Sequence, residues 1–312
     1  MFRRIVGVSI AAALSVASVA HAQDVRIADS LLRAGQLDRA ETEYYAATRQ
    51  RPRDPAARFA LGKYLLDRGS FRIGATLIDE AMQFGYDKTS ASALLARVYA
   101  NLGEYSAVEH LPGVASLPSD QRALVRWLAA QPQRTDSSDG ALLAAFTRVS
   151  VAGYLGAVRL RLNGQSLVAL VSPRATCGLR VADTAAVAAS MHRFGTWAGA
   201  DSLAIGRLTL RPVPVEIERM REPAQAIVCL GMLARFAPTF DARANLMTLH
   251  GNGVAPAPSR ASVVAAILDV DGEYSLLRSG MWSSLSSRDV APLLDNRRWI
   301  FDPRRRQITI EP

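Results

Sequence analysis

The chain has 312 residues, which is long enough for two domains that each bury a hydrophobic core. Its formal net charge is +9, and the cations are almost all arginine. The arginine clusters are short and have no aromatic residues between them, which argues against nucleic-acid binding and favours an ordinary solvated surface. Attraction to an acidic partner or an anionic surface stays open. The scattered cysteines and histidines show no metal-ligand spacing, so neither a metal nor another cofactor is expected.

Residues 1–22 have the pattern of a secretory signal. Arg3 and Arg4 precede an apolar run, and residues 20–22 have the small-residue pattern of a cleavage site. A membrane anchor is the alternative, although the apolar run is shorter than the ~20 residues that a span needs. No later segment is apolar enough to cross a bilayer. We therefore expect an exported, soluble chain in a bacterial periplasm or outside the cell.

Residues 23–131 carry an internal period. Gly35, Gly69 and Gly103 are each 34 residues apart, and an apolar residue follows two positions after each. Small residues recur at matching positions of the expected helices: Ala28, Gly62 and Ala96 on the first, Ala40 and Gly74 on the second. Such a period indicates stacked units. The pattern resembles the tetratricopeptide repeat, a helix–turn–helix unit, and an unrelated helical bundle is the alternative.

The third unit is interrupted by Pro112 and Pro118, and residues 119–131 are expected to form a helix that caps the stack. Residues 131–140 are polar and rich in turn-forming residues, which predicts a linker between domains, placed at residues 132–145. The resemblance to the repeat family implies a groove that holds peptides or partner proteins and carries no chemistry.

Residues 158–171 predict a β-hairpin. The first strand alternates apolar and polar residues, Asn163-Gly164 supplies a tight turn, and residues 166–171 return as a buried strand. The stretch 158–176 resembles the opening of the retropepsin-like aspartic peptidases, in which such a strand ends in Asp-Thr-Gly-Ala. Here Ser172, Pro173 and Arg174 stand in that turn, so the acid and the glycine are missing.

The resemblance extends through residues 146–250, one lobe of a mainly β acid-protease fold. Its further parts are a second hairpin at 202–217, a strand and short helix at 227–236, and a closing hairpin at 240–249. Residues 251–312 are expected to form a short, degenerate second copy. In that copy Arg278, Ser279 and Gly280 fall where the acid turn would stand, and Phe301-Asp302 echoes Phe240-Asp241.

The missing acids determine the expected mechanism. Aspartic peptidases need two carboxylates that share one proton, so that one activates water while the other acts as an acid. A serine and an arginine cannot divide a proton in this way, so no catalytic residue is expected. A peptidase with a displaced acid is the alternative, with Asp183, Asp269 and Asp271 as candidates. A serine hydrolase built on Ser172 has neither a Gly-x-Ser-x-Gly turn nor an evident histidine partner.

Cys177 and Cys229 lie in a chain that is expected to reach an oxidising compartment. In the resembled fold their two strands run close together, which implies that a disulfide is feasible, and two buried free thiols are the alternative. The same resemblance makes a homodimer feasible.

The fold class expected from the sequence is therefore multidomain α and β. An N-terminal solenoid of tetratricopeptide type precedes a mainly β, retropepsin-like acid-protease fold. The expected function is that of an exported, non-catalytic interaction or scaffold protein. It would bind a protein or peptide partner through the repeat groove and the pseudo-protease cleft. An exported aspartic-type peptidase is the alternative, and the sequence does not identify the partner.

Overall fold

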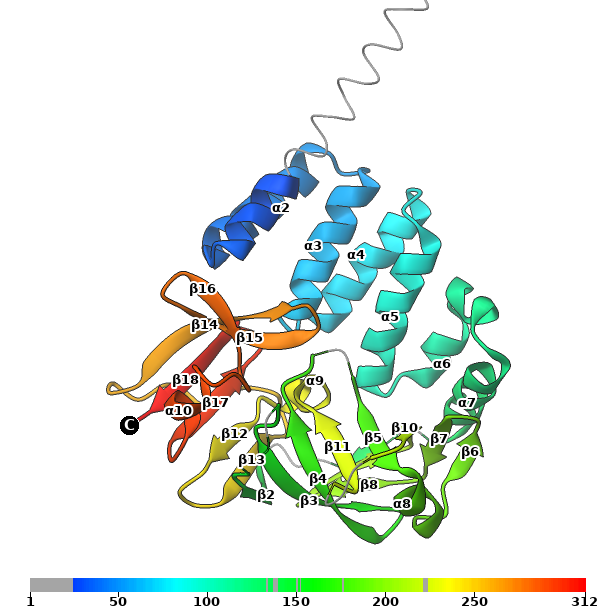
Figure 1. Cartoon of the computed structure of the whole chain (residues 1–312). Helices are drawn as coiled ribbons and strands as arrows, with labels where there is room; N and C mark the ends of the chain where they lie inside the picture. The colour runs from blue at the N-terminus through cyan, green and yellow to red at the C-terminus, as the bar shows by residue number, and fades with distance from the viewer. Residues whose placement is uncertain are drawn as a thin grey trace, which may run out of the picture. The chain divides into compact units, whose positions relative to one another are not determined.

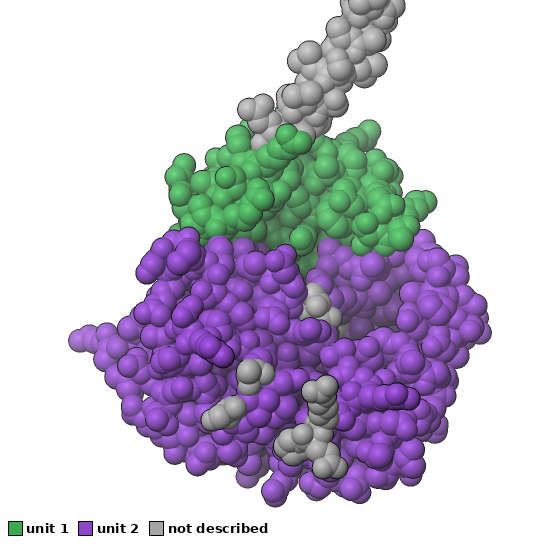
Figure 2. All heavy atoms as spheres, in the orientation of Figure 1, with its two compact units in different colours: residues 1–91 green, residues 92–312 purple. Residues whose placement is uncertain are grey.

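The computed structural model describes residues 25–132, 134–136, 140–149, 151, 153–175, 177–220 and 224–312. The expected signal at 1–22 lies outside the described residues. The chain divides into two compact units, Met1–Ala91 and Ser92–Pro312, which Figure 2 colours separately. An N-terminal helical region is followed by a mostly β region (Figure 1). Within the described ranges, no helix is both long enough and apolar enough to cross a membrane.

The helical region is made of helix pairs. Its elements are a helix at 25–33, α2 (Leu37–Gln50), α3 (Pro55–Asp67), α4 (Phe71–Gln83), α5 (Lys88–Leu102), α6 (Tyr105–Glu109), the short 3₁₀ helix η1 (Pro112–Ser116) and α7 (Ser119–Ala130). Helix α5 begins in the first unit and continues into the second. Helix α6 is short, and Pro112, which fits the first position of a helix but not its interior, opens η1 soon after it.

The period of 34 residues places a glycine at the turn inside each helix pair. Gly35, Gly69 and Gly103 have φ values of 73°, 71° and 78°, the left-handed conformation that glycine adopts without strain. In each turn the glycine N–H donates to the carbonyl three residues back, and the next N–H donates to the carbonyl five residues back. This is the hydrogen-bond pattern of a Schellman motif, which ends one helix and starts the next.

Small residues bring α3 and α4 close together. A Cβ atom on Gly62 would lie 2.8 Å from Ile78 Cγ1, and a Cβ atom on Gly74 would lie 2.8 Å from the Gly62 carbonyl oxygen. These glycines therefore allow two backbones to cross in contact. The rings of Tyr44 and Tyr64 pack 5.0 Å apart in the core that α2 and α3 share.

The second unit contains the strands. In chain order the elements are β1 (Arg134–Asp136), β2 (Ala141–Thr147), β3 (Gly156–Leu162), β4 (Gln165–Ser172), β5 (Leu179–Ala182), α8 (Asp183–Ala188), β6 (His192–Phe194), β7 (Trp197–Ala200), β8 (Leu203–Ile205), β9 (Leu208–Arg211), β10 (Val213–Glu218), β11 (Ala226–Cys229), α9 (Leu230–Leu233) and η2 (Ala234–Phe236). There follow β12 (Thr239–Asp241), β13 (Leu246–His250), β14 (Val263–Val270), β15 (Glu273–Arg278), β16 (Met281–Ser284), α10 (Ala291–Leu294), β17 (Arg298–Asp302) and β18 (Gln307–Glu311).

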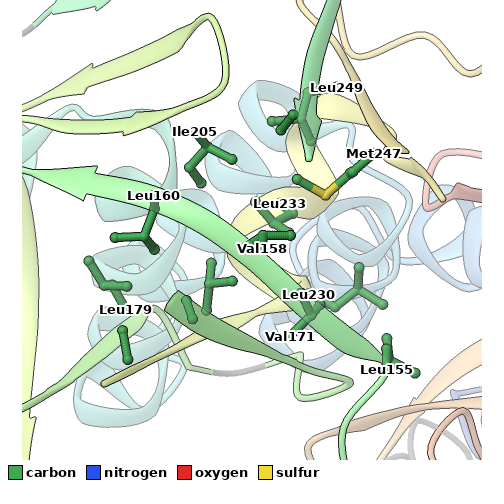
Figure 3. Packing of buried hydrophobic residues seen from close by; sticks show 14 of the residues in the cluster. Leu155, Val158, Leu160, Val171, Leu179, Ile205, Leu230, Leu233, Met247 and Leu249 are labelled. Atoms are coloured by element: carbon green, nitrogen blue, oxygen red, sulfur yellow. The ribbon is translucent and has the colours of Figure 1, made fainter. Parts of the chain in front are cut away.

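The first part of the β region is built on the hairpin of β3 and β4, whose turn is Asn163-Gly164. Strand β4 also pairs in parallel with β11, which pairs with β5, and β5 pairs in parallel with β10. Buried residues of β3, β4, α9 and β13 gather in one core, among them Leu160, Val171, Leu230 and Met247 (Figure 3). Helix α9 thus fills the space beside the strand that ends at Ser172.

The closing strands of the two expected copies pair with each other. The order of this sheet is β2–β13–β12–β17–β18–β14, with β12 antiparallel to β17 at its centre (Figure 1). Each half of the order repeats the other in reverse. Phe240 stacks on Trp299 at 4.1 Å and meets the edge of Phe146 at 5.1 Å, so the aromatic core continues across both halves.

Two local features differ from what the sequence pattern suggested. The expected linker at 132–145 includes β1, which pairs with β9, and the first residues of β2, which pairs with β13. Strand β1 has only three residues and lies in a polar stretch, so it gives no strand pattern, and the apolar start of β2 directly after that stretch was included in the linker. The hairpin of β6 and β7 was not anticipated either, since its strands are short and not strongly alternating.

Candidate functional site

The turn that follows β4 is held by backbone hydrogen bonds on both sides. On one side the Gly231 N–H donates to the Arg174 carbonyl at 3.0 Å. On the other, the Tyr274 N–H donates to the Pro173 carbonyl at 3.0 Å, and the Ala175 N–H donates to the Gly272 carbonyl at 2.8 Å. The turn is therefore fixed between the start of α9 and the hairpin turn that joins β14 to β15.

The side chains in this turn have no acid among them. Ser172 is buried and its Oγ accepts a hydrogen bond from the Arg174 N–H at 3.4 Å, while the Arg174 side chain is exposed. A buried hydroxyl that already accepts a backbone N–H is poorly placed to act as a nucleophile without a base beside it. What the turn offers is a fixed backbone with a hydroxyl and a guanidinium group.

The second expected turn lies elsewhere. Ser279 and Gly280 form the tight turn between β15 and β16, with φ values of 50° and 79°, and both are exposed. Arg278 Nη1 donates to the Asp289 carbonyl at 3.0 Å. The turn after β4 contacts β15 at Tyr274, about 13 Å of strand away from Arg278 at ~3.3 Å per residue. The structure thus sets the turn after β4 against the beginning of β15 rather than its end.

The candidate displaced acids fall into two groups. Asp183 is an exposed residue at the start of α8 and forms an ion pair with Arg193 at 2.8 Å. Asp269 lies near the end of β14, and Asp271 lies in the β14–β15 turn, which bonds to Ala175. There Asp269 Oδ1 accepts the Gly272 N–H at 2.9 Å, which is a turn-stabilising role, and Asp271 is exposed with φ of 52°.

A disulfide joins the segment after the turn to the strand beside it. Cys177 and Cys229 are bonded, with their Cα atoms 5.7 Å apart. The Cys229 N–H also donates to the Gly178 carbonyl at 3.1 Å. This cross-link ties Cys177 to β11, and residues 177–179 form part of one wall of a cavity.

The cavity has a volume of about 440 Å³ and lies within the second unit. Its walls are the end of α5 with the turn into α6, residues 175 and 177–179, β9 with β10, and α9 with the residue Arg235 in η2. Trp197, Leu210 and Met232 give it an apolar surface. Three arginines and two glutamates also line it: Arg97, Arg211, Arg235, Glu104 and Glu216.

Two of the groups at the cavity have displaced pKa values. Tyr105 is buried, and the desolvation raises the pKa of its phenol well above the ordinary value. Its hydroxyl lies 3.5 Å from the Pro212 carbonyl oxygen. Arg235 is half-buried. The protein around its guanidinium group removes it from water, and this desolvation lowers its pKa. The Tyr105 phenol and the Arg235 guanidinium group, which both line the cavity, therefore lie in surroundings of low polarity.

No family model matches this chain, and no curated protein matches its sequence. Among solved structures, the chain is similar to a retropepsin-like aspartic protease from Rickettsia conorii. The two are 13% identical, and the match covers 38% of this chain and 93% of that protein's chain, with a TM-score of 0.27. We infer no function from a similarity of this size.

The sequence patterns indicate the turn residues but give no indication of the cavity. Its walls come from segments between residues 97 and 235 that share no motif, so only the folded chain brings them together. The single signal in the sequence was Cys177, which is both a disulfide partner and a lining residue. Within the part of the chain that the structure describes, no three His, Cys, Asp or Glu side chains gather closely enough to hold a metal ion.

Proposed function

We propose that the chain is an exported, non-catalytic protein that binds polypeptide segments. The turn after β4 carries this proposal. Ser172, Pro173 and Arg174 occupy it, and hydrogen bonds from Gly231 and Tyr274 fix its backbone. Hydrolysis of the aspartic type needs two carboxylates that share a proton. A serine next to an arginine, which stays charged at any ordinary pH, cannot supply that pair.

The proposal includes a family assignment for each region. The helix pairs, with their repeated glycine turns, would be tetratricopeptide repeats whose groove holds a partner segment. The β region would be a degenerate retropepsin-like lobe, which the paired closing strands β12 and β17 support. Such a cleft can still accept an extended peptide by main-chain hydrogen bonds, because strand addition does not use the acids. The expected signal at residues 1–22 is the basis for proposing that the protein is exported to a periplasm or out of the cell.

A peptidase with a displaced acid is the second candidate, and one contact favours it. The β14–β15 turn brings Asp269 and Asp271 next to the turn after β4, through the hydrogen bond between Ala175 and Gly272. A carboxylate from that turn would have to act on water beside Ser172. Asp269 already accepts a backbone N–H, which holds it in the turn.

One experiment separates the two candidates. The full chain is incubated with casein peptides from about pH 3 to about pH 7, where paired carboxylates titrate. Mass spectrometry of the peptides detects cleavage, and co-elution of peptide and protein in size-exclusion chromatography detects binding. Intact peptides that co-elute with the protein support the proposal. Cleavage that disappears in Asp269→Ala or Asp271→Ala, but persists in the exposed control Asp289→Ala, would overturn it in favour of the peptidase.

A further inference from the structure

The cavity in the second unit has the size and surface of a small-molecule site. Its volume of about 440 Å³ lies within the range of pockets that hold small organic molecules. Trp197 and Met232 supply apolar surface from β7 and α9. A ligand with a compact apolar body would therefore be shielded from water here, which is the main source of affinity in such pockets.

The charges that line the cavity are complementary to an anion. Three guanidinium groups and two carboxylates belong to its lining: Arg97, Arg211, Arg235, Glu104 and Glu216. Glu216 is already engaged by Arg180, at 3.0 Å. Taken together, the three arginines and two glutamates give the lining a net positive charge, so a neutral or cationic ligand would be a poorer match than an anionic one.

Arg235 is the lining cation in the least polar surroundings. Its guanidinium carbon lies 4.6 Å from the centre of the Phe236 ring, and the buried Tyr105 is close enough to interact with its charge. Burial lowers the pKa of this guanidinium group, because desolvation destabilises the charged form. A bound anion would compensate for that cost. A guanidinium group has five N–H donors, so it can bind a carboxylate and still keep its partners within the protein.

We propose that this cavity binds an organic carboxylate with an apolar body. The carboxylate contacts Arg235 and Arg97, and the apolar body packs against Trp197 and Met232. Two sources share this chemistry: a free organic acid, and the C-terminus of a peptide that ends in an apolar residue. This site does not depend on the proposed function, because none of residues 172–174 belongs to the lining of the cavity.

Calorimetric titration of the full chain tests the site with matched probes. The free acids are 4-phenylbutanoate and octanoate, and 4-phenylbutanamide is the uncharged match of the first. The peptide arm uses acetyl-Ala-Ala-Leu with a free carboxyl group and the same peptide with an amidated end. We expect saturable binding of at least one acid form, with its amide at least about tenfold weaker, since the amide cannot form charge-assisted hydrogen bonds with the guanidinium groups.

Two variants locate the site. Arg235→Gln removes the cation, and we expect binding to weaken about tenfold or more. Gly178→Leu instead adds a bulky side chain at a lining residue: a Cβ atom at Gly178 would meet nothing within 4 Å, so the fold should persist while the added side chain obstructs the ligand. The matched control is Arg288→Gln, an exposed arginine outside the lining, which should bind as the unaltered chain does. Thermal melting of each variant checks that it is folded.

The outcomes decide the inference in both directions. Binding of an acid form that is lost in Gly178→Leu and in Arg235→Gln supports the site, and the tighter of the two arms identifies the source. Equal affinity for the acid and its amide would overturn the proposed site, because binding would then not depend on the negative charge of the ligand. So would binding that survives Gly178→Leu, or the absence of saturation by any acid below about 1 mM. Cleavage of the peptide probe would count against the proposed function alone.

Discussion

Gly231 allows the turn after β4 to approach the start of α9. A Cβ atom at this position would lie 2.0 Å from the carbonyl oxygen of Ala175, which belongs to the backbone and cannot rotate away. We predict that Gly231→Ala lowers the free energy of unfolding by about 1–3 kcal/mol, the usual cost of overpacking. Urea denaturation followed by circular dichroism measures this change.

Gly178 offers a matched control for this prediction. It lies three residues after Ala175, the residue that Gly231 approaches, but a Cβ atom at Gly178 would meet nothing within 4 Å. Gly178→Ala should therefore change the free energy of unfolding by no more than about 0.5 kcal/mol. An equal loss in both variants would show that the close approach at Gly231 is not the cause.

His250 should make stability depend on pH. Burial and, to a smaller extent, the charge of Arg298 lower its pKa below the ordinary value of 6.5. The unfolded chain therefore takes up a proton at His250 more readily than the folded chain, and stability falls as the pH drops below about 6.5. We predict that His250→Gln, which can still meet Thr239, loses less stability than the unaltered chain between about pH 7.5 and about pH 5.5.

Thermal melts of both proteins at the two pH values measure this difference. If the two melting temperatures shift equally on acidification, His250 does not titrate as the structure implies.

What the sequence could predict at this scale depended on local chemistry. Gly35, Gly69 and Gly103 were found because a helix pair needs a positive φ at its turn, whatever surrounds it. The pairing of Cys177 with Cys229 stayed open, because it depends on strands 52 residues apart lying side by side. Arg235 carried no signal at all, since its burial is set by Tyr105 and other residues far away in the chain.

Helix α7 and the β6–β7 hairpin form the clearest unit at the scale of elements. The Trp127 ring lies 4.8 Å from His192 and 6.2 Å from Phe194. It also covers Gly199, where a Cβ atom would lie 2.2 Å from the indole ring. The hairpin is too short to be stable alone. Strand β7 is also paired with β10, so it is β6, at the far side of β7, whose order depends most on this helix.

We predict that Trp127→Ala loosens the hairpin while the sheet of β3, β4 and β11 stays intact. Backbone amides of β6 and β7 should exchange with solvent about tenfold faster or more, which corresponds to ~1.4 kcal/mol of local stability. Hydrogen exchange read by NMR or mass spectrometry measures this. The matched control is Arg126→Ala, an exposed neighbour on the same helix, which should leave the exchange of β6 and β7 unchanged.

This prediction would be contradicted if β4 and β11 lost protection together with the hairpin.

The contact between α7 and the β6–β7 hairpin could not be predicted from the sequence. Residues 119–131 were expected to be a capping helix because of their composition, and α7 does lie there. That it also holds the β6–β7 hairpin depends on Trp127, whose partners lie about 65 residues later, and no local pattern encodes such a contact.

At the scale of the whole chain, the two expected copies of the β unit share one sheet. The echo of Phe240-Asp241 in Phe301-Asp302 predicted a duplication, and the structure pairs the two strands, β12 and β17. The echo could be seen because both strands keep the same buried aromatic position. The match at Arg278 was less informative, since a short turn of polar and small residues forms wherever two strands must reverse, and here it joins β15 to β16.

This shared sheet predicts that the copies unfold together. Trp299 is 1% exposed and stacks on Phe240 across the β12–β17 pair. We predict that Trp299→Ala lowers the free energy of unfolding by about 3–5 kcal/mol, whereas Trp299→Phe, which keeps a ring there, costs less than about 1.5 kcal/mol.

Hydrogen exchange under mild denaturant decides whether this loss spreads beyond the second copy. In the alanine variant, amides of β3 and β4 in the first copy should lose protection together with those of β17 and β18, because Phe240 links the two aromatic cores through Phe146. If β3 and β4 instead keep their protection while β17 and β18 exchange freely, the first copy folds alone. The second would then be an attachment to it rather than half of one cooperative unit.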